Sequence, residues 1–384
     1  MKNLRLEFIR GLAAVEVLIC HLLTNNAFLK DKSWTSMITN WATESVILFF
    51  LLSGIVINIS QKRQNLSFFP FLKNRLLRIY PLFLVGFILA IITFLIIYKE
   101  NLDFKVLSGN LLLLGSFQSY LVPVLKTNPV VWSLTYEMFF YFIFSLSILK
   151  YQRKFLHLWF VLSIICIPFY YMNFTGLLGH LIAMFAFSSI WLLGYYMYEY
   201  RSLFVKQDLL TVLFFTALLP GISRLHLSDN YYDVFKYFIF SIFSVPLFLF
   251  CINSKTNDNS PTININNFHK FIAFVLVAGL VVLCSNSLLL SKLIYLLLPF
   301  IFFVLSLMGE QPKFNFSFLK SPALFLGKVS YAVYIIHFPI ILLVNYLIPV
   351  QFYYLSILVP SILVFALAWC LEKYFQPFVV HYFK

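Results

Sequence analysis

Charge is the scarcest property of this 384-residue sequence, in which 11% of residues are Asp, Glu, Lys or Arg and 61% are hydrophobic. An ordinary soluble domain has about 25% charged residues, so the composition excludes that class. The mean hydropathy of +0.90 and the aromatic content of 20% instead predict a polytopic membrane protein. The net charge of +14 comes from short basic clusters between apolar runs, a pattern that favours membrane orientation and predicts no nucleic-acid partner.

Several motifs are also missing. The five cysteines all lie in apolar stretches and lack paired spacing, which excludes a disulfide framework and a zinc site. The sequence has no serine nucleophile elbow, no metal-ligand cluster and no Gly-rich phosphate loop, so hydrolase and ATP-driven classes lack support and we expect no metal. We find no internal repeat and no appended soluble domain, and therefore expect one integral-membrane domain over residues 1–384.

Twelve apolar runs predict an all-α, polytopic transmembrane helix bundle of about 10–12 spans. The runs cover residues 8–26, 44–60, 78–98, 130–149, 155–172, 178–199, 208–226, 232–252, 269–285, 288–308, 323–347 and 352–371. A shorter run, residues 107–121, has the length of a re-entrant or interfacial segment and is not counted. If the N-terminus lies inside, 20 of the 28 Lys and Arg residues face the cytoplasm, so we expect both termini there.

The first apolar run contains a cation and an imidazole on one helical face. Arg10 and His21 are eleven residues apart, which brings their side chains within about 20° of each other around a helix. The rise is about 16 Å, so if Arg10 lies at one interface, His21 lies near the bilayer midplane. Ionisable residues at that depth usually mark a functional site, although a histidine satisfied by a neighbouring helix is the alternative.

Two arginines three residues apart, Arg75 and Arg78, begin the third span in NRLLRIYPLF. Their guanidinium groups share one helix face, an arrangement that suits phosphate recognition. The spacing fits a plain positive-inside anchor equally well.

A lone carboxylate, Glu137, lies inside the fourth span in VVWSLTYEMFFYFIF. It is surrounded by Trp132, Tyr136 and Tyr141 and needs a cation, a donor or a proton. We favour a functional role, while a structural partner to a buried arginine or histidine remains compatible with the same site.

A polar stripe marks the span over 323–347, where Ser330, Tyr334 and His337 follow one another at i, i+4 and i+7. The stripe fits a cavity lining and a helix-to-helix hydrogen-bonding role equally well. The pair Ser53-Gly54, in the second span, favours close helix packing.

These motifs occur in the order seen in the membrane acyltransferase 3 family, which the sequence resembles over nearly its whole length. The resemblance rests on Arg10 with His21 and on four motifs: FFLLSG at 49–54, RLLRIYPL at 75–82, WSLTYEMFFY at 132–141 and SYAVYIIHFPI at 330–340. The sequence around Glu137 is most similar to that of the exopolysaccharide or O-antigen O-acetyltransferase branch. Where family members often have an acidic residue before the Phe-Phe of the second helix, this chain has Ile47.

The resemblance implies an O-acetyltransferase that moves an acetyl group from cytoplasmic acetyl-CoA, its co-substrate, to a hydroxyl of a surface or lipid-linked glycan. It places the chain in a bacterial cell membrane, with the lipid bilayer and the glycan acceptor as partners. It implies catalytic roles for Arg10, His21 and Glu137 and donor binding by Arg75 and Arg78. We expect the neighbouring polar and aromatic side chains to contact substrate: Trp132, Ser133, Tyr136, Tyr141, Ser330, Tyr334 and His337.

His21 is suited to two roles, a general base for the acceptor hydroxyl or a transient acyl carrier, and the sequence does not choose between them. The alternative function is a transporter or flippase for a lipid-linked saccharide, which also needs intramembrane charges and aromatic residues. That alternative predicts no consumption of thioester.

Overall fold

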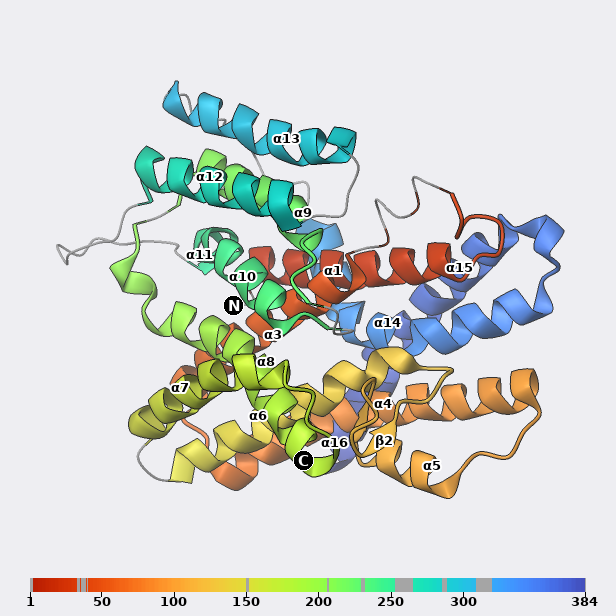
Figure 1. Cartoon of the computed structure of the whole chain (residues 1–384). Helices are drawn as coiled ribbons and strands as arrows, with labels where there is room; N and C mark the ends of the chain where they lie inside the picture. The colour runs from red at the N-terminus through yellow and green to blue at the C-terminus, as the bar shows by residue number, and fades with distance from the viewer. Residues whose placement is uncertain are drawn as a thin grey trace. The chain divides into compact units, whose positions relative to one another are not determined.

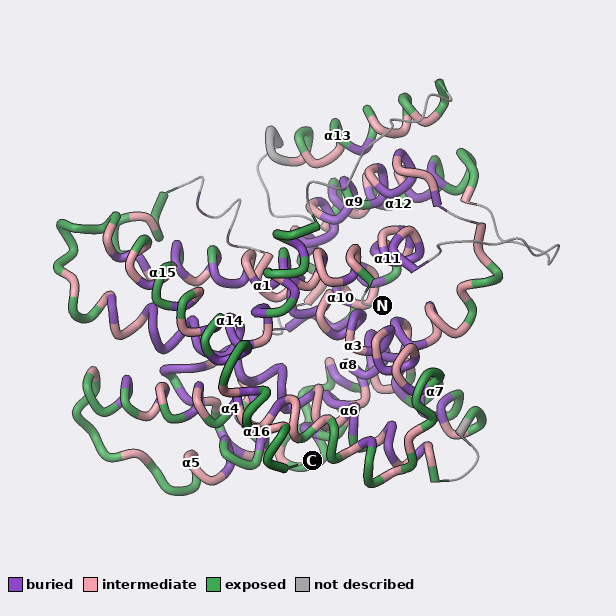
Figure 2. Tube along the Cα trace, turned by 180° about the vertical axis from the view of Figure 1, so that it is seen from behind, coloured by how far each residue is buried: buried purple, intermediate pink, exposed green. Residues whose placement is uncertain are grey.

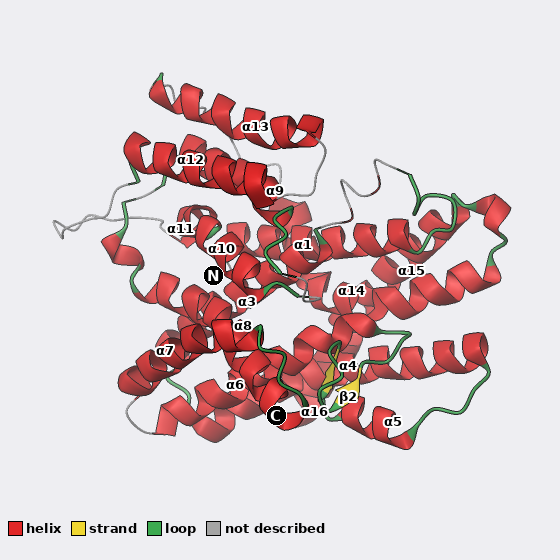
Figure 3. Cartoon of the chain, in the orientation of Figure 1, coloured by secondary structure: helices red, strands yellow, loops and turns green. Residues whose placement is uncertain are grey.

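The computed structural model describes residues 3–32, 35, 39, 41–149, 152–205, 207–228, 232–252, 265–284, 289–308 and 320–383. Helices make up most of these residues, with one pair of very short strands (Figures 1 and 3). The first half contains α1 (Leu4–Thr24), α3 (Ala42–Gln64), α4 (Phe68–Tyr98), α5 (Phe104–Leu111), β1 (Gly115–Ser116), β2 (Val122–Pro123), η1 (Pro129–Val131), α6 (Trp132–Leu149), α7 (Gln152–Tyr170) and α8 (Gly176–Glu199). The second half contains η2 (Arg201–Leu203), α9 (Leu209–Ser223), α10 (Val234–Phe243), α11 (Val245–Ile252), α12 (Asn267–Cys284), α13 (Leu289–Leu307), α14 (Lys320–Leu347), η4 (Val350–Phe352), α15 (Leu355–Cys370), the π-helical η5 (Leu371–Phe375) and α16 (Gln376–Phe383).

The predicted fold class is confirmed, because the described residues form an all-α polytopic bundle. Each of the twelve predicted ranges contains a helix. Within the described residues, however, eight helices are long and apolar enough to cross a membrane, or nine if the bent pair α10–α11 is one span. This number is lower than the 10–12 expected from hydropathy alone.

Length and charge explain the difference. Helix α9 is apolar but has 15 residues, fewer than a membrane-spanning helix needs. Helix α1 is long enough, with 21 residues, but it carries four charged side chains, including Glu7, Arg10 and Glu16. These charges lower the hydropathy of α1. Charged side chains inside a membrane-spanning helix often belong to a functional site.

The short apolar run over 107–121 does not form a long helix. Helix α5 begins after Asp103, whose carboxylate accepts a hydrogen bond from the Lys105 backbone N–H at 2.7 Å. The parallel pairing of β1 with β2 follows, and the Thr135 hydroxyl of α6 donates to the Gly115 carbonyl at 2.9 Å. These contacts hold the segment against the start of α6.

The chain divides into two compact units, which are described separately. The first consists of Met1–Leu6, Ile47–Gln64 and Ser189–Ser321, and the second of Glu7–Val46, Asn65–Ser188 and Pro322–Lys384. In the first unit, α9 packs against α10, α11, α12 and α13. The expected single domain over 1–384 stays a prediction.

Helices α3 and α8 of the first unit pack closely at small residues. A Cβ on Gly54 would lie 2.0 Å from the Trp191 carbonyl oxygen, and one on Gly194 would lie 2.2 Å from the Leu51 carbonyl oxygen. The Trp191 indole N–H donates to the Ser53 hydroxyl at 3.1 Å. The packing role predicted for Ser53-Gly54 is therefore confirmed, since only glycine allows such an approach.

Helix α14 is the most buried candidate span, with 78% of its most apolar window buried, against 22% for α12 (Figure 2). Two glycines bring other helices of the second unit against it. A Cβ on Gly86 of α4 would lie 2.2 Å from Ile335 Cγ2, and a Cβ on Gly11 of α1 would lie 2.5 Å from Leu326 Cβ. Helix α14 is therefore the element against which α1 and α4 are positioned.

Helices α1 and α14 run parallel. Gly11 lies against Leu326, His21 lies against His337, and the Asn345 amide donates to the Asn25 carbonyl at 2.8 Å. Along these contacts the residue numbers of α1 and of α14 increase in the same direction, so the two helices are parallel. The close approach at Gly11 thus fixes the neighbours of His21 ten residues later, about 15 Å along the helix.

Candidate active site

Two histidines that are far apart in sequence form a stacked pair in the second unit. The rings of His21 on α1 and His337 on α14 have centroids 5.3 Å apart and planes 24° apart. Phe338 lies edge-on to His21 at 5.0 Å. The sequence singled out both histidines, and the structure brings them together.

His337 has a fixed orientation. Its Nδ1 lies 2.8 Å from the Tyr334 carbonyl oxygen and 3.1 Å from the Val333 carbonyl oxygen. A carbonyl oxygen only accepts, so Nδ1 carries the proton and donates it. In the neutral ring Nε2 is then a hydrogen-bond acceptor, and it is buried without a partner among the described residues.

Tyr334 connects α14 to the start of α6. Its hydroxyl donates to the Val130 carbonyl at 2.8 Å and lies 2.8 Å from the Ser133 hydroxyl, which therefore donates to it. Ser330 instead donates to the Gly327 carbonyl of its own helix at 3.0 Å. Of the three stripe residues, Tyr334 joins helices, His337 reaches His21, and Ser330 is satisfied locally.

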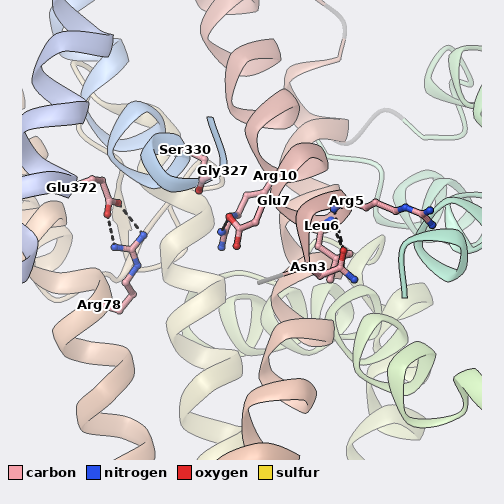
Figure 4. Close-up of polar contacts among 9 residues, drawn as sticks. All are labelled: Asn3, Arg5, Leu6, Glu7, Arg10, Arg78, Gly327, Ser330 and Glu372. Carbon is pink, nitrogen blue, oxygen red and sulfur yellow. Dashed lines mark hydrogen bonds and ion pairs between the residues drawn. The ribbon is translucent and has the colours of Figure 1, made fainter. Parts of the chain in front are cut away.

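Arg78 forms a bidentate ion pair with Glu372, a residue that the sequence analysis did not single out. Its two terminal nitrogens lie 2.8 and 2.9 Å from the carboxylate oxygens of Glu372 in η5 (Figure 4). The Glu372 side chain is 4% exposed and that of Arg78 is 40% exposed. Two of the five guanidinium N–H groups are thus used, and the guanidinium still reaches the surface.

Arg75 lies over aromatic rings. Its guanidinium carbon is 5.4 Å from the Phe71 ring centroid and 5.9 Å from that of Tyr141. The Tyr141 hydroxyl in turn donates to Glu137. Glu137 of α6 therefore lies near the two arginines of α4, a placement that fits the predicted need for a nearby cation.

The two parts of the site are connected along one face of α14. Tyr331, Tyr334 and His337 follow one another at intervals of three residues, and we call them the polar seam. Arg78 lies 5.6 Å from the Tyr331 ring centroid, and the Tyr331 hydroxyl donates to the Ile79 carbonyl of α4 at 2.9 Å. The seam runs from the arginines to the histidine pair, about 9 Å along the helix.

Arg10 lies at the arginine end of this arrangement. It forms an ion pair with Glu7 on its own helix, beside the turn of α14 that carries Gly327 and Ser330 (Figure 4). The structure does not bring Arg10 and His21 together, because a common helix face leaves about 16 Å of rise between them.

The aromatic residues near Glu137 form a separate buried cluster. Trp132 lies edge-on to Tyr136 at 5.4 Å, and Tyr136 lies 4.9 Å from Phe187 of α8. Trp132 and Tyr136 are 4% and 1% exposed. The expected substrate contacts of Trp132, Ser133, Tyr136 and Tyr141 stay predictions, with Tyr141 and Ser133 lying next to the seam.

Sequence reasoning missed Glu372 and Tyr331. Glu137 was singled out as a carboxylate inside a span, whereas Glu372 lies just beyond the last predicted run, where that argument does not apply. Glu16 of α1 accepts a hydrogen bond from the Cys20 thiol of its own helix at 3.3 Å.

Fold and site together define a polytopic membrane protein in which His21 of α1 and Arg78 of α4 both lie against side chains of α14, His337 and Tyr331. Residues 3–265 match the family model described as an acyltransferase domain, and the chain belongs to this acyltransferase 3 family. The resemblance stated from the motifs is thereby confirmed, and membership favours a membrane acyltransferase over a transporter.

The chain is also similar to the acyltransferase MdmB of Streptomyces mycarofaciens. The two are 30% identical over 174 residues, which are 42% of this chain and 44% of the relative. The chain thus spans less than half the length of this curated relative. No solved structure matches the chain significantly.

Proposed function

We propose that this membrane acyltransferase transfers an acetyl group from cytoplasmic acetyl-CoA to a hydroxyl of a cell-surface or lipid-linked glycan, in a bacterial cell membrane. The observation that carries the proposal is the stacked pair of His21 and His337. The His21 imidazole is suited to take the proton of a hydroxyl, and the buried His337 holds its neighbour in place. Acetyl as the acyl group and glycan as the acceptor follow from the family resemblance.

In the transfer step, one proton moves to and from His21 while one ester bond replaces the thioester bond. His21 takes the acceptor hydroxyl proton as the hydroxyl oxygen attacks the thioester carbonyl. The new O–C bond replaces the C–S bond, and the CoA sulfur leaves as a thiolate that takes the proton back from His21. His337, fixed through Nδ1, is a positioning residue for His21 in this step.

The arginine cluster is the proposed donor site. Arg75 and Arg78 hold the CoA phosphates by charge-assisted hydrogen bonds, while the thioester extends along the polar seam towards His21. Glu372 supports this arrangement, because it fixes the Arg78 guanidinium and leaves three of its N–H groups for another acceptor. Arg10, paired with Glu7 near the same end of the seam, adds positive charge on the donor side.

Mass spectrometry of surface glycans tests the proposal. Cells with the gene should carry glycan species heavier by one acetyl group than cells without it, and a gene copy encoding His21→Ala should not restore them. A variant at the exposed His157, His157→Ala, is the matched control and should restore acetylation. Identical glycan masses with and without the gene would contradict the glycan acceptor. Acetylation restored by His21→Ala would remove His21 from the mechanism.

The role of His21 needs a second readout. A general base leaves His21 unmodified, whereas an acyl carrier forms an acetyl-imidazole. With the purified protein and acetyl-CoA alone, the base role predicts no rapid release of CoA thiol, because no acceptor is present to attack the thioester. A burst of CoA thiol equal in amount to the protein would replace the base with the carrier role.

A further inference from the structure

A second group of buried polar atoms lies in the same unit, away from the histidine pair and the arginine cluster. The hydroxyl of Tyr136 and both ring nitrogens of His180 lack a hydrogen-bond partner among the described residues. The side-chain carbonyl of Gln118 is a further buried atom without one. Tyr136 and His180 are 1% and 2% exposed, so bulk water does not satisfy these groups.

Such a concentration of unsatisfied atoms requires an explanation. More than about 90% of buried polar groups in proteins are hydrogen-bonded, because an unsatisfied one costs about 1–3 kcal/mol. Four such atoms in one neighbourhood indicate a binding partner supplied from outside the chain, either ordered water or a ligand. The surrounding side chains decide which ligand chemistry fits.

Aromatic rings connect the members of this group. The Tyr120 ring lies edge-on to that of His180 at 6.1 Å. Tyr136 joins the group through Phe187, whose ring lies 4.9 Å from that of Tyr136 and 6.2 Å from that of Tyr170. Gly179 makes room for Tyr120, since a Cβ there would lie 2.8 Å from Tyr120 Cε1. The Gln118 amide donates to the Tyr170 hydroxyl at 2.6 Å, which orients its carbonyl oxygen.

The group therefore offers hydrogen-bonding atoms of both kinds between aromatic rings. A phenol both donates and accepts, a neutral imidazole does one at each nitrogen, and the Gln118 oxygen accepts. None of these side chains carries a fixed positive charge, which a phosphate or carboxylate would need. A neutral ligand with several hydroxyls and an apolar face matches both features.

We propose that Gln118, Tyr120, Tyr136 and His180 form a subsite that binds the hydroxyl groups of a neutral sugar ring of the acceptor. The inference rests on the proposed function and adds to it the class of sugar and the residues that select it. Trp132, packed against Tyr136, provides the apolar wall of the subsite. His180 and Tyr120 are then specificity-determining residues and have no part in the transfer chemistry.

The test is a kinetic comparison of two variants of the purified full-length protein. Tyr136→Phe removes one oxygen atom and keeps the ring packing, and His180→Phe removes both ring nitrogens. With acetyl-CoA as donor and methyl glycosides of neutral hexoses as acceptors, each should raise the acceptor KM by about 5- to 10-fold, the effect of one lost buried hydrogen bond. The kcat and the KM for acetyl-CoA should stay within twofold of wild type.

A matched control and a deoxy-sugar series complete the experiment. Tyr237→Phe, at a buried tyrosine of α10 in the other unit, should leave every constant unchanged. A monodeoxy glycoside lacking the hydroxyl that Tyr136 binds should show the raised KM with wild type and no further rise with Tyr136→Phe.

The outcomes separate the two proposals. Transfer by wild type with an unchanged acceptor KM in both variants would contradict the subsite alone and would assign the unsatisfied atoms to buried water. Failure of wild type to acetylate any of the glycosides would contradict the glycan acceptor and the subsite together.

Discussion

The packing of α1 against α14 at Gly11 provides the most specific prediction about the site. A Cβ at Gly11 would lie 2.5 Å from Leu326 Cβ and 2.9 Å from the Leu326 carbonyl carbon. Ordinary contact begins at 3.4 Å, so the Gly11→Ala variant must separate the helices by about 1 Å. A backbone atom is among the obstacles, and it cannot move aside as a flexible side chain would.

The expected consequence is a loss of rate in a folded protein. Alanine favours the helix over glycine by about 1 kcal/mol, which offsets part of the packing cost. The displacement is carried along α1 to the stacked pair of His21 and His337, and a 1 Å misplacement of a reacting group costs on the order of 100-fold in rate. Gly11→Ala should therefore reduce acetyl transfer at saturating substrates by about that factor, while the protein stays folded in detergent with a modestly lowered unfolding temperature.

Gly279→Ala is the matched control, because a Cβ on Gly279 of α12 meets nothing within 4 Å. It should retain the wild-type rate, and the added alanine should favour the helix by the same increment. A transfer rate for Gly11→Ala within twofold of that of Gly279→Ala would refute the argument that this glycine contact positions the histidines.

Three further predictions concern the ion pair of Arg78 with Glu372, the second histidine of the stacked pair and the membrane topology. Glu372→Gln should lower the free energy of unfolding by about 1–3 kcal/mol. This value lies between those of exposed and buried ion pairs, because the Arg78 side chain is 40% exposed. An unchanged unfolding temperature would show that the ion pair contributes nothing to stability. His337→Phe keeps a stacked ring but loses the fixed nitrogens, and should slow transfer by about 100-fold; a normal rate would reduce His337 to a packing residue. Single cysteines at the exposed positions Gln64 and Lys126, in a cysteine-free background, should respectively resist and accept an impermeant thiol reagent in intact cells, and labelling of Gln64 would overturn the predicted cytoplasmic donor side.

Helix parity supports this topological test. Helices α1 and α14 run parallel, so if both cross the membrane an odd number of crossings separates them. Six long spans lie between them among the described helices, so one or all three of α9, α13 and the bent pair α10–α11 must also cross. With α15 as the last span, the total is then 10 or 12, and both termini lie on one side.

The sequence predicted the fold class and located ionisable residues within its spans because the bilayer imposes strong rules on composition. Long apolar runs must be helices there, and each ionisable residue within them needs a partner. Those rules singled out His21, Glu137 and His337 without any knowledge of their neighbours.

The sequence could not predict which helices meet. Periodicity assigns a residue to a face of its own helix and carries no information about the opposing helix, so His21 and His337, more than 300 residues apart, remained in separate motifs. The same limit explains Arg10: sharing a face with His21 places both on one stripe, but the rise of about 16 Å prevents contact. The partner of Arg78 was missed because Glu372 lies just beyond the last predicted run, where a charge is unremarkable in sequence.

The central claim is that His21 performs acetyl transfer from acetyl-CoA, and one measurement tests it most directly. Purified wild-type protein and the His21→Ala variant are incubated with acetyl-CoA labelled in the acetyl group and with the methyl glycosides, and label in the glycoside is counted alongside binding of acetyl-CoA. We predict that His21→Ala binds acetyl-CoA within twofold of wild type and loses at least about 100-fold in transfer rate. Transfer by His21→Ala at near the wild-type rate would contradict the account.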